Sequence, residues 1–185
     1  MKALKIVKKP ESVMSEIAQA ILKGSIEGGV EITQNELAVS LGVSRMPVRE
    51  ALVVLEELGL VERLHNQHIK VTSINEEFFS QIFSLMAVVV TGACDIRALQ
   101  KNFTFQDESA FFFAVLQEVQ NPFFRHLLKN FCSVFLSFVL ASPTHDCKNG
   151  LEQLRQSLST DTGSLKDYFA LLAADAWSNK KIRGA

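Results

Sequence analysis

The sequence predicts a mainly α-helical protein of two domains, residues 1–74 and 75–185. Apolar residues recur at three- and four-residue spacing through most of the chain, whereas short strand patterns occur in the first domain. The composition also changes between the two domains, because all fourteen phenylalanines lie at position 78 or later. The second domain should therefore have a much bulkier core than the first.

The first domain is expected to open with two helices. Ser12 is placed to cap a helix that runs to about Lys23, where Gly24 breaks the pattern. A short extended piece at 30–32 precedes the second helix. Thr33 and Glu36 have the spacing of a capping box at its start, and Gly42 closes it.

A third helix is expected between Ser44 and Gly59. The Ser44 side chain is placed to accept from free N–H groups of the first turn, and Pro47 is tolerated only in that turn. Arg45 and Arg49, one turn apart, fall on a face away from the apolar stripe. The stripe consists of Val48, Leu52, Leu55 and Leu58.

The order of these elements predicts a winged helix-turn-helix. The second and third helices flank the tight turn at Gly42, as in a helix-turn-helix. Residues 60–64 and 69–72 then have strand patterns joined by a short turn, which predicts a hairpin. Two arginines alone would be equally typical of a solvated surface helix. In this setting they favour a recognition helix that meets DNA base edges in the major groove.

The run NELAVSLGVSRMPVREALVVLEELGLVERL resembles the DNA-binding domain of the GntR family of bacterial transcription regulators. Nearly every position of the family pattern, LA-xx-LGVSR-x-PVREAL-xx-L-xx-GLV, is met between Leu37 and Val61. The resemblance implies that Arg45 and Arg49 contact the operator, that Ser44 contacts a phosphate, and that Pro47 belongs to the same contact segment. An arginine fork on guanine O6 and N7 is worth roughly 1–3 kcal/mol of discrimination.

Two departures from the family pattern imply an altered operator. Many members have an arginine where this chain has Asn35, and asparagine prefers adenine edges or contacts phosphate. The wing commonly carries Arg-Gly where this chain has Gln67-His68. Its minor-groove contact would then fall to His65, for which an exposed turn residue without DNA contact is an equal alternative. Gln67 is also a candidate DNA-binding residue.

The second domain is expected to be an antiparallel helical bundle, because no strand pattern occurs in it. Asn75 is placed to cap a first helix that continues to about Leu99. Four further helices are expected at about 106–118, 122–141, 147–158 and 164–178, with Ser142-Pro143 ending the third helix.

In order, these helices resemble the FCD effector domain of the FadR branch of the same family. The best local match is DESAFFFAVLQEVQNP, residues 107–122, and only residues 99–105 stand where the family has another helix. Many FCD domains hold a divalent metal with one Asp and three His. Here Glu108 takes the Asp position, Phe112 the first His position, and Gly150 and Leu172 or Ala173 the later two. One carboxylate cannot supply the four ligands of such a site, so we expect no metal and no cofactor here. Glu108 and Phe112 remain as candidates for lining a ligand pocket.

Other chemistry has little support in the sequence. His145-Asp146-Cys147 favours a loop with a helix cap at Asp146 over a catalytic triad, because adjacent residues rarely point at one another in the required geometry. No Gly-rich phosphate loop, HExxH or GxSxG motif is present, so we expect no enzyme. The three cysteines are widely spaced without a CxxC pair, which argues against a disulfide framework and a structural zinc site.

Charge and hydropathy indicate a cytoplasmic protein without a membrane partner. Residues 1–74 carry nine Lys/Arg and nine Asp/Glu, so any positive surface for DNA must be local. The N-terminus has no apolar run of signal-peptide length, and unbroken apolar runs such as Met86–Val90 are too short to cross a bilayer.

Three hypotheses follow. The first is a homodimeric transcription regulator, by expectation a repressor, that binds a palindromic operator in double-stranded DNA and responds to a small apolar or carboxylate effector. In the second, the shortened helical domain has lost sensing and is a dimerisation or protein-interaction module. The third, an apolar-ligand carrier without DNA binding, requires the arginines to be idle. A closed cavity beside Glu108 and Phe112 would favour sensing, and a packed interior would disfavour it.

Overall fold

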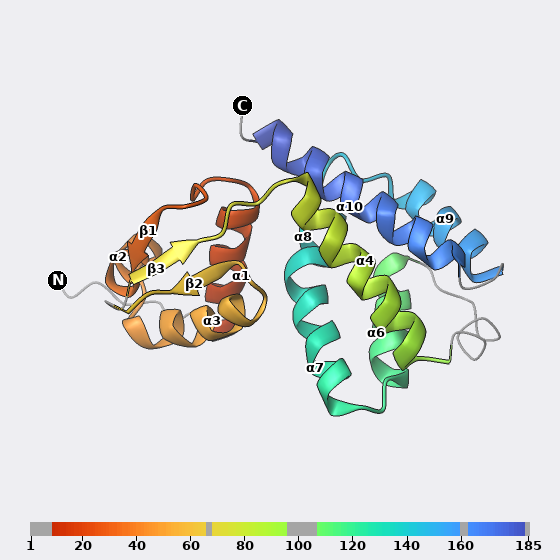
Figure 1. Ribbon diagram of the computed structural model, residues 1–185, viewed down its shortest axis with the longest axis horizontal. Coiled ribbons are helices and arrows are strands. Elements are labelled where there is room, and N and C mark those ends of the chain that lie inside the picture. The colour runs from red at the N-terminus through yellow and green to blue at the C-terminus, as the bar shows by residue number, and fades with distance from the viewer. Residues whose placement is uncertain (1–8, 66–67, 96–106, 160–162, 184–185) are drawn as a thin grey trace. The chain divides into compact units, whose positions relative to one another are not determined.

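The computed structural model describes residues 9–65, 68–95, 107–159 and 163–183 (Figure 1). The chain divides into two compact units, one made mainly of the residues up to Ile74 and the other of residues 75–182. The first unit combines helices with a small antiparallel sheet, and the second is helical in its described part. The predicted fold class, a winged helix-turn-helix followed by a helical domain, is confirmed.

The first unit contains α1 (Pro10–Leu22), α2 (Gln34–Leu41) and α3 (Arg45–Glu57). The start expected for α1 was wrong: the helix begins at Pro10, with Lys9 at the N-cap, and Ser12 lies inside it. Proline at the first helical position explains the difference, because its fixed φ suits a helix and its missing N–H needs no partner there.

The predicted ends of α2 are confirmed. The Thr33 hydroxyl accepts from Glu36 N at 3.2 Å, and the Glu36 carboxylate accepts from Thr33 N at 2.7 Å. This backbone hydrogen bond lowers the pKa of Glu36. Gly42 ends the helix at φ +66°, a left-handed conformation that glycine adopts without a steric penalty.

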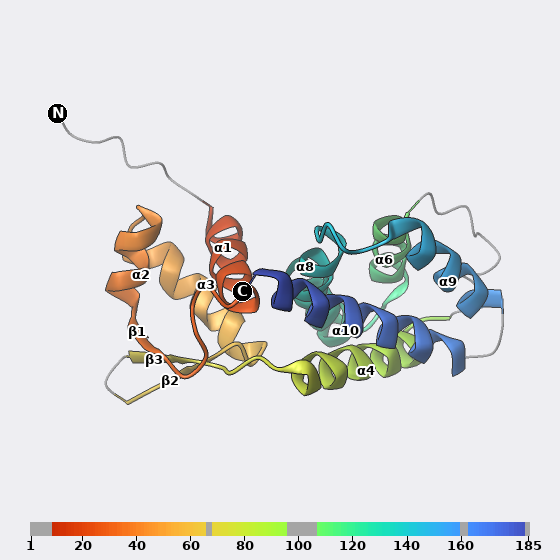
Figure 2. The ribbon, with the colours of Figure 1, turned by 90° about the horizontal axis from the view of Figure 1, so that it is seen from above.

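The sheet has the order β1-β3-β2, with both pairs antiparallel (Figure 2). The predicted hairpin is present as β2 (Val61–Arg63) and β3 (His68–Val71). The added strand is β1 (Glu31–Thr33), which was expected only as an unpartnered extended piece. Its register sets Thr33 opposite His68, so the start of α2 is attached to the wing.

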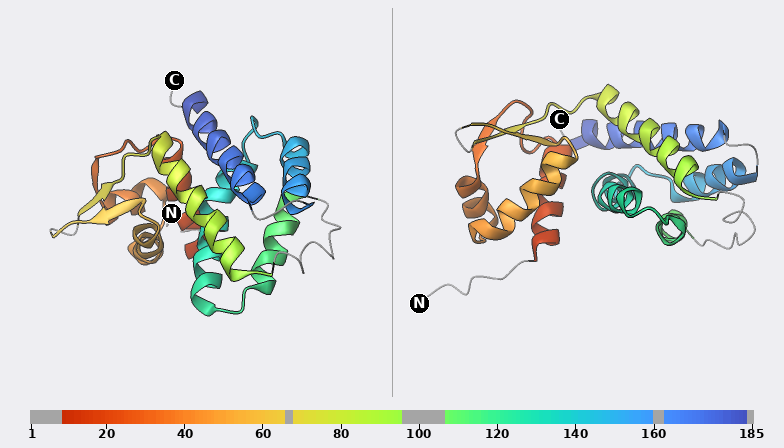
Figure 3. Two further views of the ribbon diagram at one scale, coloured as in Figure 1. Left: turned by 45° about the vertical axis from the view of Figure 1, so that its right-hand side comes forward. Right: turned by 60° about the horizontal axis from the view of Figure 1, so that its bottom comes forward.

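The second unit contains α4, α6, a long broken helix, α9 and α10 (Figure 3). Asn75, Asp107 and Asn121 accept backbone N–H bonds of 2.8–2.9 Å at three helix starts. The bounds are α4 Glu76–Ala93, α6 Glu108–Glu118, α7 Pro122–Phe131, η1 Cys132–Leu136, α8 Ser137–Leu140, α9 Cys147–Ser159 and α10 Gly163–Arg183.

Three details of this unit differ from expectation. Helix α4 ends at Ala93 instead of Leu99, because Cys94 adopts an extended conformation. The expected third helix contains the π-helical stretch η1, which a 3.6-residue pattern does not reveal. Helix α10 continues five residues past the expected end at Ser178. The expected connection at 99–105 lies outside the described residues.

An aromatic core occupies the second unit, as the distribution of phenylalanine predicted. Phe79 stacks on Phe138 with 6.1 Å between ring centroids, and Phe83 meets Phe131 edge-on at 5.2 Å. By length and composition, Glu76–Ala93 and Pro122–Leu140 are apolar enough to cross a membrane, with mean hydropathies of 1.2 and 1.3. These helices also supply the four paired rings, and 28% and 39% of the two segments, respectively, are buried.

Replacing Thr33 with Ala should lower the free energy of unfolding of the first unit by about 1 kcal/mol. The hydroxyl would no longer accept from Glu36 N or donate to the Glu36 carboxylate, which lies 2.8 Å away. Far-UV circular dichroism in urea measures this change. The one tryptophan of the chain, Trp177, lies in the second unit, so its fluorescence transition should stay unchanged. Thr33→Ser keeps the hydroxyl and should retain stability; equal losses in both variants would contradict this account of the helix start.

Candidate nucleic-acid interface and a buried polar cluster

A pocket with a volume of about 470 Å³ lies where α2, α3 and β3 meet, and we call it the helix-start hollow. It brings together Asn35, Arg45 and Arg49, three of the side chains that the sequence marked for DNA contact. All three are exposed. The complete lining is Thr33, Gln34, Asn35, Arg45, Met46, Arg49 and His68.

Local structure explains how these side chains converge. The capping box fixes the first turn of α2, where Asn35 lies, and Gly42 turns the chain so that α3 begins beside it. Arg45 is the first residue of α3, and Arg49 follows one turn later on the same side. Val48 and Leu55 are fully buried and anchor the opposite side of α3. The surface is therefore locally positive although the unit has no excess of basic residues.

Ser44 and Pro47 occupy the start of α3, but the capping role expected for Ser44 was wrong. Ser44 is the N-cap residue by position, yet its side chain makes no capping hydrogen bond. Its exposed hydroxyl and the first-turn N–H groups can therefore turn to an external acceptor. Pro47 is half-buried as the third residue of the helix, where its missing N–H leaves no bond unmade.

The wing presents a different histidine from the one that the sequence put forward. His65 is exposed in the turn after β2 and does not line the helix-start hollow, whereas His68 does. His68 Nδ1 lies 3.7 Å from Glu31 Oε2, a contact between β3 and β1. Gln67 lies outside the described residues. Sequence reasoning missed His68 because only the β1–β3 register brings it to α2.

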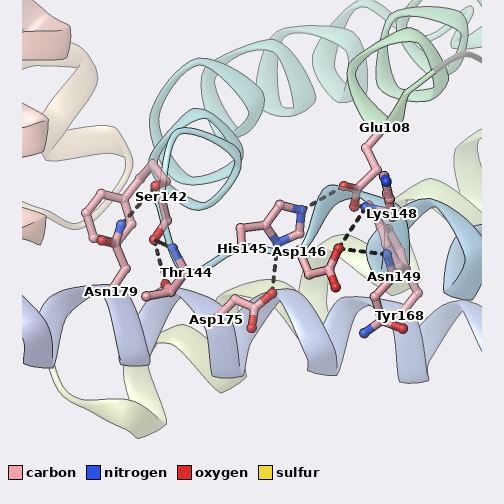
Figure 4. Close-up of polar contacts among 11 residues, drawn as sticks. Glu108, Ser142, Thr144, His145, Asp146, Lys148, Asn149, Tyr168, Asp175 and Asn179 are labelled. Atoms are coloured by element: carbon pink, nitrogen blue, oxygen red, sulfur yellow. Dashed lines mark hydrogen bonds and ion pairs between the residues drawn. The ribbon is translucent and has the colours of Figure 1, made fainter.

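The second unit holds a polar cluster around Glu108, whose exposed fraction is 3 % (Figure 4). His145 Nε2 donates to Glu108 Oε2 at 2.7 Å, and His145 Nδ1 donates to Asp175 Oδ2 at 2.8 Å. Tyr168 Oη donates to Glu108 Oε1 at 2.5 Å. Carboxylates accept from both ring nitrogens of His145, so both nitrogens carry protons and the ring is an imidazolium. This cation compensates the buried carboxylate.

The pKa values in the cluster follow from these contacts. The hydrogen bond to Glu108 raises the pKa of His145 to about 9, assisted by Asp175 and opposed by burial. Burial, together with the neighbouring Glu108 charge, raises the pKa of Tyr168 well above its ordinary value. Near neutral pH His145 therefore stays charged and Tyr168 stays a hydrogen-bond donor.

The expectation of a lone carboxylate at Glu108 was wrong. His145 comes from the segment between α8 and α9, which lies away from the helical positions counted for metal ligands. Helix α9 also approaches Glu108 so closely that a Cβ on Gly150 would lie 2.7 Å from both of its carboxylate oxygens. A larger residue at 150, histidine included, would displace Glu108.

The residues present do not fit the one-Asp, three-His metal site of FCD domains. Phe112 is buried with its ring 6.4 Å from Tyr168, Gly150 has no side chain, and Leu172 is buried. Donor atoms of Glu108, His145 and Cys147 do lie within 4.8 Å of one another. However, His145 Nε2 already donates a hydrogen bond to Glu108, so a cation would have to displace the proton between these two residues. Cys147, the third residue of the group, is exposed.

The two ligand-pocket candidates, Glu108 and Phe112, face different surroundings. Phe112 lines an open apolar groove of about 490 Å³ between α6 and the η1–α8 segment. Among the described residues, the lining of this groove does not include Glu108, because His145 and Tyr168 fill the space at its carboxylate. Of the two candidates, Phe112 is therefore the one that lines this groove.

The loop with a cap at Asp146 is confirmed. Asp146 Oδ1 accepts from Lys148 N at 3.0 Å and from Asn149 N at 3.2 Å, which starts α9. Both nitrogens of His145 bond to Glu108 and Asp175 instead of to its sequence neighbours. These contacts exclude His145-Asp146-Cys147 as a catalytic triad.

Comparison with known proteins gives its strongest matches over the first unit. Residues 9–71 match the family described as bacterial regulatory proteins, gntR family. An uncharacterized HTH-type transcriptional regulator of Mycobacterium tuberculosis is 39% identical over 61 residues, 33% of this chain and 25% of that protein. The gluconate operon transcriptional repressor of Bacillus subtilis is 26% identical over 155 residues, 70% of this chain and 63% of that repressor. The description of the matched family is that of regulatory proteins.

The fold also matches a solved structure along nearly its whole length. The structure described as "Lar controls the expression of the Listeria monocytogenes agr system and mediates virulence" has a TM-score of 0.51 and 16% sequence identity. The match covers 94% of this chain and 99% of that one, and at this identity it shows the fold alone. The chain spans about a quarter of the length of the Mycobacterium relatives that it matches.

The His145 cluster should make stability depend on pH in a defined direction. A pKa of about 9 in the folded chain exceeds the ordinary value of 6.5. The cluster's contribution, roughly 3 kcal/mol, should therefore be complete below pH 6.5 and lost as pH rises through about 9. Urea unfolding followed by Trp177 fluorescence between pH 6 and 10 measures it.

Two histidine variants serve to assign this pH dependence. His145→Gln should be less stable at neutral pH, and its free energy of unfolding should no longer decrease as the pH rises through about 9. His126→Gln removes an exposed histidine from the same unit and should keep this decrease. An identical decrease in His145→Gln would show that another group titrates.

Proposed function

We propose that this chain, which carries a GntR-family helix-turn-helix domain, is a transcription regulator that binds a specific operator in double-stranded DNA. The observation that carries the proposal is the helix-start hollow, where Asn35, Arg45 and Arg49 converge at the start of α3. A helix start that presents exposed fork-shaped and amide donors matches the donor and acceptor pattern of the major groove. In this arrangement the two arginines take guanine or phosphate, and Asn35 takes adenine or phosphate.

The proposed contacts beyond the hollow are made with the DNA backbone and the minor groove. Ser44, free of any capping bond, contacts a phosphate together with the first-turn N–H groups of α3, and Pro47 shapes that turn. The wing takes the minor groove through His65 and Gln67, with His68 at the border of the hollow. Phosphate contacts set the position of the domain, and contacts with base edges set its specificity.

We propose that two copies act together on a palindromic operator. One winged helix presents few base contacts, whereas a two-fold dimer repeats them on a second half-site about one helical turn away. The second unit offers apolar surface for association: on α4, Leu85 is 54 % exposed and Val88 is 59 % exposed, one turn apart. Cytoplasmic location and repression of the target genes complete the proposal.

The contacts inside the second unit bear on its proposed role. We place it with the FCD domains by the order of its helices, but the cluster at Glu108 leaves no space there for a carboxylate effector. Glu108 and Asp175 would also repel one. This favours the second candidate function, a dimerisation module that has lost sensing at this position. The open groove beside Phe112 is the place that an apolar effector would occupy.

Replacing Arg49 with Ala should weaken binding to a DNA duplex selected from genomic fragments by about 1–3 kcal/mol, with the fold intact. Fluorescence anisotropy with the selected duplex measures the loss, and circular dichroism checks the fold. Arg49→Lys keeps the charge without the planar fork and should lose discrimination between bases while keeping most of the salt dependence. Lys23→Ala, outside the hollow, controls for loss of positive charge; unchanged affinity in Arg49→Ala would contradict the proposed recognition helix.

The full chain, with a mass of 20.6 kDa, should form particles of about twice that mass in sedimentation equilibrium. It should also bind the selected duplex with two chains per palindrome. Leu85→Lys adds a charge to the exposed face of α4 and should shift the equilibrium toward single chains if that face takes part. A wild-type chain that remains single both free and on DNA would contradict the proposed dimer.

A further inference from the structure

We infer that Met46 is a specificity residue that contacts the C5-methyl group of a thymine in the major groove. This inference rests on the proposed function, because it assigns one base to the surface that we propose to enter the groove.

The position of Met46 carries the inference. It is the second residue of α3, and its side chain lines the helix-start hollow together with Asn35, Arg45 and Arg49. The exposed fraction of Met46 is 60 %. Scattered exposed apolar residues are ordinary on protein surfaces, so exposure alone would mean little. Here the apolar side chain stands between the polar and charged groups proposed to read DNA.

The chemistry of the major groove supplies a matching partner. Base edges there present hydrogen-bond donors and acceptors and a single apolar group, the C5-methyl of thymine. The thioether of methionine can neither donate nor strongly accept, so the base edges cannot satisfy it by hydrogen bonding. A flexible methionine can adjust to contact a methyl group and remove both from water.

Asn35 strengthens the choice of thymine. Asparagine can bond adenine N6 and N7, and the partner of adenine in the duplex carries the methyl group. Asn35 and Met46 line the same hollow from two different helices. If Asn35 takes an adenine, the expected half-site contains either one A·T pair that both groups contact or two neighbouring A·T pairs.

The test removes only the methyl group from the DNA. The full chain first selects a duplex from a random library, and each thymine of the selected half-site is then replaced by uracil, which lacks the C5-methyl. Wild-type affinity should fall about fourfold for each half-site at one thymine position, the value expected for one buried methyl-sized group. In Met46→Ala the same replacement should have no effect at that position.

A ratio of thymine to uracil affinities within each variant cancels any uniform loss of binding. Val53→Ala is the matched control, because Val53 lies two turns further along the same face of α3, is 43 % exposed and is not a lining residue of the hollow. This control should keep the uracil effect.

The other possible outcomes would contradict either the assignment of Met46 or the proposed function. Binding that ignores every uracil replacement, or an equal uracil effect in Met46→Ala, overturns the assignment of Met46 and leaves the proposed function standing. Failure to enrich any sequence from the library overturns the proposed function, and the inference with it.

Discussion

The arrangement of the candidate DNA-contacting side chains depends on Thr33. Thr33 forms the last residue pair of the β1–β3 ladder, with His68 as its partner. Its hydroxyl and its N–H also form the capping box with Glu36. Its side chain also lines the helix-start hollow. One residue thus joins the wing, the start of α2 and the surface presented by α3. Because the sheet and the helix meet in a single residue, the wing cannot shift without moving the first turn of α2.

A second constraint, the compensation of a buried carboxylate, organises the helical unit. Glu108 at the start of α6 is bonded by His145 from the segment before α9 and by Tyr168 of α10, and Asp175 holds the other side of the imidazole. Removing any partner would leave a buried charge or polar group unsatisfied, which costs more than the net value of the bond. The same contacts occupy the position at which many FCD domains hold a metal, and where we expected none. An imidazolium therefore supplies the positive charge there, and Gly150 provides the space that the closely packed carboxylate needs.

Much of the first unit could be predicted because its signals are local. Capping residues, the left-handed Gly42 and the apolar stripe of α3 each act within a few positions of the chain, and the helix-turn-helix and hairpin follow from their order. The errors have equally local causes: Pro10 starts α1 earlier than Ser12 could, and the Ser44 hydroxyl does not take the bond that its position allows. In the second unit, the π-helical stretch within the third helix left no mark on the apolar periodicity.

The sequence by itself determined most of the helices and the winged helix-turn-helix, because short-range spacing encodes both. The family resemblance added Asn35, and strengthened Arg45 and Arg49, as candidate readers. Only the tertiary structure decided which side chains share a surface. The pairing of β1 with β3 placed His68 and not His65 in the hollow, and the packing of α6 against α9 and α10 joined Glu108 to His145 across 37 positions of the chain. Such contacts depend on how elements pack after they form, and residue spacing along the chain carries no record of that packing.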